Sequence, residues 1–322
     1  MTQITFAPFC NFNNAVPWGL WVVMYIWLVG ISVGSFVLVM WGNLQGSQNL
    51  KALTKIATLV SISALLSGLL SIQIDLGHIE RFPSLFLTPN FKAIMAWMAW
   101  LYTAYLGVLL VSLFWLKKEV PKLFCGFAII FALVALIAES LLFARPPGKV
   151  WHSLFFPIHF VTSSFVSATA TLIILAAISK LKIARDILLK SLGRIALPVV
   201  FLNTLVEIIE LANHRSLFHS SGLILLSLNI IIIALLLKNK PAGIIQFGYL
   251  GLIQVFFSKY HSIISAQLIE PYKGFANAYI EPRLNYSYAP SSFEIFVAIG
   301  LLIAVPVIFY FLYKIFPLTK EA

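Results

Sequence analysis

The chain has 322 residues, of which 61% are hydrophobic and only 10% are charged. A soluble globular domain of this composition would lack the polar side chains that cover its surface, so the composition excludes that class. The formal net charge of +11 could indicate nucleic-acid binding. In a membrane protein, however, Lys and Arg concentrate in loops on one side of the bilayer, so we expect a lipid membrane and no nucleic acid as the partner.

Long hydrophobic runs recur along the whole chain. A membrane-spanning helix needs roughly 20 mostly apolar residues, so these runs predict an all-α integral membrane protein. We expect about nine transmembrane helices (eight to ten) in a single transmembrane domain over residues 1–322. The predicted spans are 16–41, 56–75, 93–116, 122–143, 154–179, 194–212, 217–237, 241–258 and 293–313. The span at 241–258 is the shortest, and a long connection at 259–292 separates it from the last one.

The basic residues predict the orientation of these spans. Most of the 22 Lys and Arg lie in the segments that follow the odd-numbered spans, with the densest run at 180–194. Because cytoplasmic loops are enriched in Lys and Arg, we expect these segments in the cytoplasm. The N-terminus is then outside and the C-terminus inside, in the cytoplasmic (inner) membrane. The connection at 259–292 is extracytoplasmic in this arrangement.

Acidic residues inside or near the spans gather toward the predicted outer face. The second span ends in IDLGHIERF, which carries Asp75 and His78, and Glu139, Glu207 and Glu210 lie in later spans. Ionisable groups within spans are costly and usually face a bundle interior or a wet cavity. The four acids therefore predict a shared polar site near the outer surface. For Asp75 and Glu139 the alternative is a cap at a helix end, whereas Glu207 and Glu210 share a helix face at spacing i, i+3.

This combination of residues fits the chemistry of a quinone. A quinone head group needs a hydrogen-bonding group at each carbonyl, a proton route and an apolar slot for its ring and tail. An acid beside a His can relay protons, and aromatic side chains can flank the ring. The alternative for the aromatic residues of the first span is the ordinary interfacial belt. The candidates for quinone protonation are Asp75, His78 and Glu139. The candidates for quinone contacts also include Trp21, Tyr25 and His159, and those for an inward proton path are Asn203, Glu207 and Glu210.

Other redox groups are not expected in this chain. A haem b needs axial His on facing helices, but His152 and His159 lie on one helix face at spacing i, i+7 and cannot bracket a haem. Cys10 and Cys125 lie far apart and form no ligand cluster, so we expect no iron–sulfur cluster and no metal site.

Small residues in two spans predict close helix packing. Gly30 and Gly34 form a small-xxx-small face in the first span. Ser163 and Ser167 repeat this spacing in the fifth span. The repetition suggests two related four-helix halves, formed by spans one to four and spans five to eight.

Several stretches resemble the polysulfide reductase NrfD family. They are PWGLWVVMYIWLVGISVGSF, IDLGHIERFPSLFLTPNFKAIMAWMAWLY, RPPGKVWHSLFFPIHFVTSSFVSATA and LVEIIELANH, and together with the last part they cover most of the chain. The last part, FFSKYH followed by YAPSSFEIFVAIG, is similar to the HybB-type branch, the quinone-linked membrane subunit of certain nickel–iron hydrogenases. The resemblance implies two four-helix bundles plus an extra C-terminal helix.

The resemblance also implies a function and places residues in it. Such proteins carry no redox centre, bind menaquinone or ubiquinone near the outer face, and dock an extracytoplasmic ferredoxin-like iron–sulfur subunit. This partner is joined in turn to a catalytic subunit, such as a hydrogenase or a molybdopterin enzyme. Asp75 and His78 match the D-L-G block, although the family more often has Arg or Gln at position 78. Glu139 and Glu207 match acidic positions tied to the quinone site or a proton path, and Tyr25 matches a polar quinone contact.

We therefore expect a membrane anchor and quinone-reactive subunit of a respiratory oxidoreductase complex, with or without proton translocation. The chain itself is expected to be non-catalytic. The alternative is a secondary transporter or ion-coupled permease, with the acids as its substrate or ion site. Transporter sites commonly lie at the membrane midplane between broken helices, whereas these acids lie toward one face. The outer loops and the connection at 259–292 are expected to bind the iron–sulfur subunit, with a lid over the protein's own helices as the alternative for that connection.

Overall fold

The computed structural model describes residues 16–77, 79–115, 118–144, 152–179, 184–213, 220–270, 274 and 286–316, and these residues form helices and their connections without any strand. The long helices are α1 (Leu20–Gln45), α3 (Thr54–Asp75), α5 (Ile94–Ser112), α6 (Lys122–Ala144), α7 (Phe155–Ile178), α8 (Arg185–Asn213), α9 (Ser220–Leu237), α10 (Pro241–Tyr260) and α12 (Ser292–Ile315). The short elements are α2 (Gln48–Lys51), η1 (Ile79–Arg81), α4 (Ser84–Leu87), η2 (Leu113–Trp115) and the π-helical turn η4 (His261–Ser265).

The predicted all-α membrane protein is confirmed. In the described part of the chain, eight helices are long and apolar enough to cross a membrane, and α9 is a shorter apolar helix. The predicted weak span at 241–258 is in fact a 25-residue helical segment that runs to Ser265. The connection therefore begins later than residue 259. The sequence pattern ended the span early because Lys259 and His261 are polar, but both side chains are buried within the protein.

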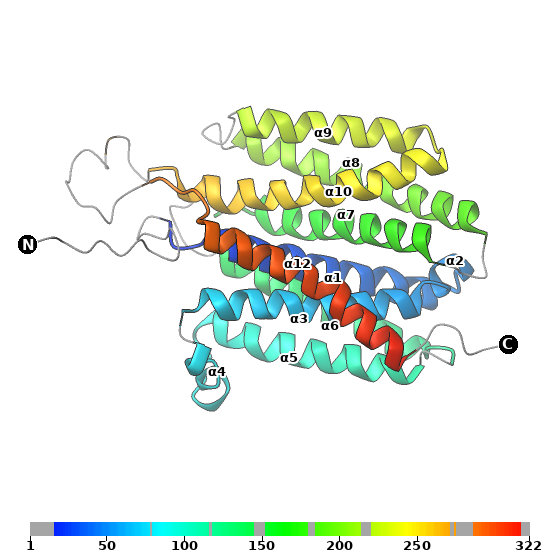
Figure 1. Cartoon of the computed structure of the whole chain (residues 1–322), viewed down its shortest axis with the longest axis horizontal. Helices are drawn as coiled ribbons and strands as arrows, with labels where there is room; N and C mark the ends of the chain where they lie inside the picture. Colours follow the sequence, from blue (N-terminus) through cyan, green and yellow to red (C-terminus); the bar gives the residue numbers. More distant parts are fainter. Residues whose placement is uncertain are drawn as a thin grey trace, which may run out of the picture.

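The long helices form two four-helix bundles and one additional helix (Figure 1). The first bundle contains α1, α3, α5 and α6, and the second contains α7, α8, α9 and α10. The helix α12 packs on α3 and α1 outside the first bundle. The two bundles meet where α1 contacts α7 and α10 and where α6 contacts α7. This arrangement matches the two bundles and extra C-terminal helix that the sequence predicts.

The seam between the bundles depends on the small residues of α1 and α7. A Cβ added to Gly30 would lie 2.7 Å from the Ser164 Oγ, and one added to Gly34 would lie 2.7 Å from the Ala168 Cβ. The predicted close packing of the Gly30 and Gly34 face is therefore confirmed. Small residues let the two backbones approach, which strengthens van der Waals contact in the absence of a hydrophobic driving force between membrane helices.

One end of the molecule gathers most of the residues singled out from the sequence. Here α1, α5, α7 and α12 begin, and α3, α6, α8 and α10 end, on the left of Figure 1. We call it the cavity end, because the cavity described below opens there. It corresponds to the face that the basic residues predict to be outside.

Candidate functional site

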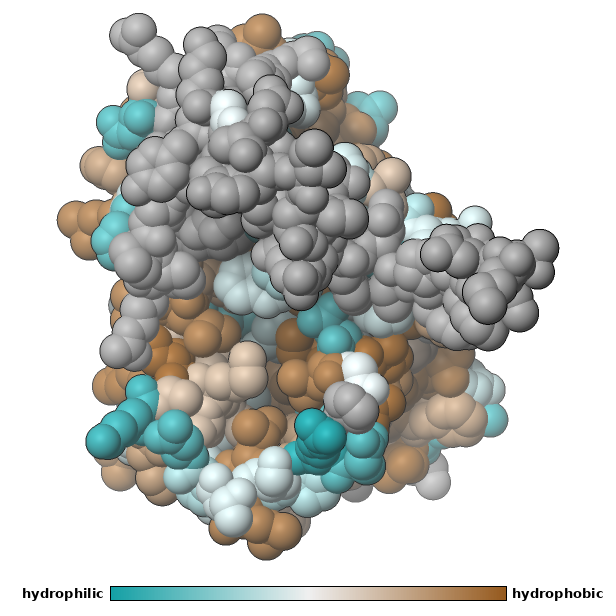
Figure 2. Space-filling view, turned by 90° about the vertical axis from the view of Figure 1, so that its left-hand side faces the viewer, coloured by the Kyte–Doolittle hydropathy of each residue, from teal (hydrophilic) through white to brown (hydrophobic). Residues whose placement is uncertain are grey.

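A cavity opens in the first bundle, between the first turns of α1 and α5 and the last turns of α3 and α6. It holds about 820 Å³ of empty space, part of which is open at the mouth. Figure 2 shows this end face on, with apolar side chains around a hollow below the grey atoms. The aromatic residues of its wall are Trp18, Tyr25, Phe82, Tyr102 and Phe143. Sites for small molecules are concave and have mostly apolar walls, so this cavity suits a flat apolar ligand.

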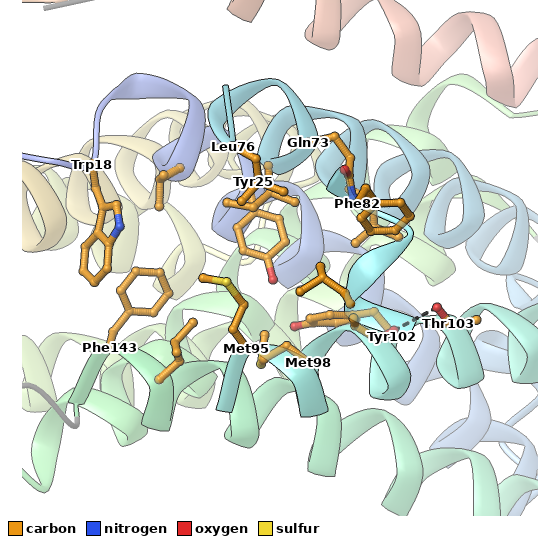
Figure 3. A pocket seen from close by; sticks show the side chains of 16 residues that line it. Trp18, Tyr25, Gln73, Leu76, Phe82, Met95, Met98, Tyr102, Thr103 and Phe143 are labelled. Atoms are coloured by element: carbon orange, nitrogen blue, oxygen red, sulfur yellow. Dashed lines mark hydrogen bonds between the residues drawn. The ribbon is translucent and has the colours of Figure 1, made fainter. Parts of the chain in front are cut away.

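The wall of the cavity carries two phenol groups backed by a buried acid. The Tyr102 hydroxyl donates a hydrogen bond to the Glu139 carboxylate, and both side chains are buried. The rings of Tyr25 and Tyr102 meet edge to face, with 6.3 Å between their centroids. Figure 3 shows the two hydroxyls pointing toward one another. Glu139 Oε1 has no hydrogen-bond partner in the described part of the chain. The wall can therefore offer hydrogen bonds to a ligand and connect it to a carboxyl group.

Trp21 does not line this cavity but faces α12. Its Nε1 donates a hydrogen bond to the Glu294 backbone oxygen at 3.2 Å, and its ring lies 6.0 Å from that of Phe293. Tyr288, which precedes α12, accepts a hydrogen bond from the Leu20 backbone N–H at 2.8 Å and donates one to Glu294 Oε1 at 2.9 Å. Burial and the nearby Glu294 raise the pKa of Tyr288, so its hydroxyl stays protonated as a donor. These bonds fasten the start of α1 to the start of α12.

Asp75 lies beside the cavity rather than in its wall. Gln73 and Leu76 line the cavity, whereas Asp75 is half-buried and interacts electrostatically with Glu294. Asp75 Oδ1 makes no hydrogen bond to any described residue. His78, the other candidate in this stretch, lies outside the described residues. The structure thus places Asp75 close to the mouth and separates it from the group around Glu139.

A second polar group forms a hydrogen-bonded chain inside the second bundle. His159 Nδ1 lies 2.7 Å from Glu210 Oε2, and His159 Nε2 lies 3.3 Å from Ser258 Oγ. Ser258 donates a hydrogen bond to Glu207 Oε1 at 3.1 Å, and Asn229 donates one to Glu207 Oε2 at 2.7 Å. All four helices of the bundle contribute to it. We call this series the Glu210–His159–Ser258–Glu207 chain.

Asn203 lies one helical turn before Glu207 on α8, at the edge of this chain. Its Oδ1 accepts a hydrogen bond from the Thr162 hydroxyl at 2.9 Å, and its side chain is buried. Asn203 Nδ2 finds no partner among the described residues. The sequence predicts one shared polar site, but the structure has two. Glu139 belongs to the first bundle, while His159, Asn203, Glu207 and Glu210 belong to the second.

Sequence reasoning missed Lys259, which it assigned to the outer connection. Lys259 is only 3% exposed, in the last turn of α10. Its Nζ lies 3.3 Å from the Phe160 backbone oxygen and 3.5 Å from the centroid of the Phe160 ring. It interacts electrostatically with Glu139 in the first bundle and with Glu210 in the second. The signal in the sequence was a single Lys directly after an apolar run, which resembles an ordinary span end.

Comparison with known proteins agrees with this architecture. Residues 9–271 match the family described as polysulphide reductase, NrfD. The chain is 24% identical to a selenate reductase subunit of Mesobacillus selenatarsenatis, over 94% of this chain and 86% of that protein. It is 24% identical to the Hdr-like menaquinol oxidoreductase integral membrane subunit of Archaeoglobus fulgidus, over 96% and 87%. A shorter match, 28% identical, covers 32% of this chain and 24% of a Halobacterium salinarum protein described as a dimethyl sulfoxide reductase membrane subunit. The chain, a multi-pass helical membrane protein, therefore belongs to the polysulphide reductase NrfD family.

Proposed function

We propose that this protein is the quinone-binding membrane subunit of an oxidoreductase complex and that the quinone occupies the cavity of the first bundle. One observation carries the proposal: an apolar, aromatic cavity has Tyr25 and Tyr102 in its wall, and Tyr102 is hydrogen-bonded to the buried Glu139. The relative from Archaeoglobus fulgidus, described as part of a menaquinol oxidoreductase, supports the same reading. Menaquinone and ubiquinone both have a flat ring and an apolar tail that suit these walls.

The chain's own residues bind the head group and handle its protons. Reduction of a quinone to a quinol takes up two electrons and two protons. The hydroxyls of Tyr25 and Tyr102 are placed to bond a carbonyl oxygen, and Glu139 exchanges a proton with that oxygen through Tyr102. Asp75 exchanges protons with water at the mouth, and His78 is kept as a second candidate for proton exchange. The electrons come from, or pass to, a partner subunit.

The partner is proposed to be a ferredoxin-like iron–sulfur subunit that docks at the cavity end and connects to a catalytic subunit, such as a hydrogenase or a molybdopterin enzyme. The names of the relatives place them in selenate reductase and menaquinol oxidoreductase, which supports an assembly of this kind. The distribution of Lys and Arg supports an extracytoplasmic position for the cavity end in the cytoplasmic membrane. The Glu210–His159–Ser258–Glu207 chain, with Asn203, is proposed as a proton path that leads inward.

The test is the purified complex with Tyr102→Phe, and Tyr249→Phe is the control because Tyr249 is an exposed tyrosine of α10. We expect an iron–sulfur partner to co-purify with the wild type. Tyr102→Phe should lower quinone-dependent turnover by about 10²-fold or more, because proton-transfer groups typically contribute 10²–10⁴-fold. Dye-dependent activity of the partner subunits should persist, and Tyr249→Phe should match the wild type in both assays. Absence of any redox partner would contradict the proposal and favour the transporter alternative.

A further inference from the structure

Lys259 is a buried cation without a matching ion pair. Its ammonium group has three N–H donors, and the described residues provide one hydrogen bond, from the Phe160 backbone oxygen at 3.3 Å. No described carboxylate lies within 4.0 Å of Lys259 Nζ. The Phe160 ring lies 3.5 Å below the nitrogen and offers a cation–π contact. A buried ammonium with so little local compensation is costly to keep charged, so its charged state depends on the acids around it, Glu139 and Glu210.

The charges that interact with Lys259 come from both bundles. Glu139 lies on α6 of the first bundle, and Glu210 and His159 lie on α8 and α7 of the second. The aromatic rings next to Lys259 also connect the two bundles. Phe160 of the second bundle stacks on Phe143 of the first with 6.2 Å between ring centroids, and Phe143 lines the cavity. One ammonium group therefore stands between the cavity's acid and the start of the Glu210–His159–Ser258–Glu207 chain.

We infer that Lys259 is the shared counter-charge that couples protonation of Glu139 in the first bundle to protonation of the His159–Glu210 pair in the second. This inference rests on the proposed function. A flexible four-carbon stem lets the ammonium shift toward whichever acid is ionised. When Glu139 is ionised, it attracts the Lys259 ammonium away from Glu210, and the His159–Glu210 pair keeps its proton. When Glu139 takes a proton, the ammonium turns to Glu210 and favours release of that proton. Coupling of this kind is reciprocal, so each site reports the state of the other.

The first experiment compares Lys259→Met and Lys259→Arg in the full membrane complex, with Lys240→Met as the control at the exposed start of α10. Lys259→Met removes the charge and keeps the length. We expect it to lower kcat for quinone-dependent turnover by about tenfold or more, within the 5–150-fold range typical of site–site coupling, with little change in KM. Lys259→Arg should restore most of the turnover because it restores the charge, and Lys240→Met should match the wild type.

Two outcomes would overturn this role. If an assembled Lys259→Arg complex loses as much turnover as Lys259→Met, the residue transfers a proton, since Arg cannot release one, and it is not a counter-charge. If Lys259→Met turns over like the wild type while Tyr102→Phe does not, the proposed coupling is wrong, whereas the proposed quinone site is still supported. Should Lys259→Met fail to assemble, the Arg variant decides alone: normal turnover supports the inference and lost turnover contradicts it.

A second experiment tests the charge balance directly. Removing the positive charge of Lys259 leaves Glu210 with His159 as its partner but without the ammonium, so removing the negative charge of Glu210 as well should relieve part of the damage. We expect Lys259→Met with Glu210→Gln to turn over faster than Lys259→Met alone, because the two charges act on each other. Residues that interact give non-additive effects in such a cycle, whereas independent residues add. Additive losses in the double variant would contradict the inference.

Discussion

The two four-helix bundles have the same architecture but differ in their interiors: one contains a cavity and the other a chain of hydrogen-bonded polar side chains. The first bundle surrounds an apolar cavity beside the buried acid Glu139, which accepts a hydrogen bond from Tyr102. The second bundle surrounds the Glu210–His159–Ser258–Glu207 chain, to which each of its helices contributes a polar side chain. One bundle holds an open cavity, and the other is filled by its own polar groups.

Side-chain size explains part of this difference. In the second bundle, α10 presents glycines to α7, and a Cβ added to Gly248 would lie 3.3 Å from the Ala170 backbone oxygen. Close backbones leave little free space and bring polar side chains within bonding distance. In the first bundle, Met95, Met98 and Tyr102 of α5 face the cavity together with Phe82. These large side chains border the space that lies between α5 and α1. Quinone protonation in the first bundle and proton conduction through the second can thus be tested separately.

The largest effect is expected for Glu139→Gln. The amide keeps the shape of the side chain and an oxygen that accepts the Tyr102 hydrogen bond, but it cannot exchange a proton at neutral pH. Quinone-dependent turnover should fall by about 10²–10⁴-fold, while dye-dependent activity of the same assembled complex persists. The exposed Glu119, changed to Gln, is the matched control and should behave as the wild type. Normal quinone-dependent turnover in Glu139→Gln would show that the first bundle does not handle the proton.

A smaller effect, about 10²-fold at the lower end of the same range, is expected for Asp75→Asn. Asp75 lies outside the cavity wall and is only half-buried, so water can replace part of its proton exchange. The two activities of the assembled complex are the measurement here as well. If Asp75 instead only caps a helix end or pairs with Arg81, the Asn variant should lose assembly rather than turnover. An effect as large as that of Glu139→Gln would place Asp75 within the same site.

The position of Asp75 shows which parts of the structure can be predicted from the sequence and which cannot. Hydrophobic runs and the small residues of α1 suffice to predict the helices and the close packing of Gly30 and Gly34. Acids in apolar helices stand out because burial is costly, so Glu139 and Glu207 can be found from the sequence. Which partner each acid meets depends on contacts between distant helices. Asp75 faces Glu294, more than two hundred residues away, and no local pattern contains that information.

The sequence predicts neither the cavity nor the burial of Lys259, because both also depend on contacts between distant helices. The cavity lies between α1, α3, α5 and α6, and its space depends on how these four helices pack together. The sequence of a single helix does not contain that information. Lys259 was assigned to a loop because a Lys after an apolar run usually marks a span end. Only the packing of α10 against α7 shows that its nitrogen lies against the Phe160 ring. Charged residues near the ends of predicted spans therefore need the tertiary structure before they are assigned to a side of the membrane.

The smallest effect on turnover is expected for Glu207→Gln. This variant gives the sharpest test of whether the two bundles have different roles. Glu207 accepts hydrogen bonds from Ser258 and Asn229, both in the second bundle. A quinone at the proposed site in the first bundle would not contact Glu207, so turnover should fall by less than about tenfold, below the range typical of groups that transfer the reacting proton. If the chain conducts protons, however, proton uptake from the side opposite the cavity should be lost.

The complex in sealed vesicles with a trapped pH-sensitive dye measures both quantities at once, with Glu119→Gln as the matched control. Turnover that persists without proton uptake would assign binding to the first bundle and conduction to the second. If turnover and proton uptake are both unchanged, the hydrogen-bonded chain serves only to satisfy buried polar groups. A loss of turnover as large as that of Glu139→Gln would mean that the two polar groups act as one site, because Lys259 stands between them and interacts with an acid of each bundle.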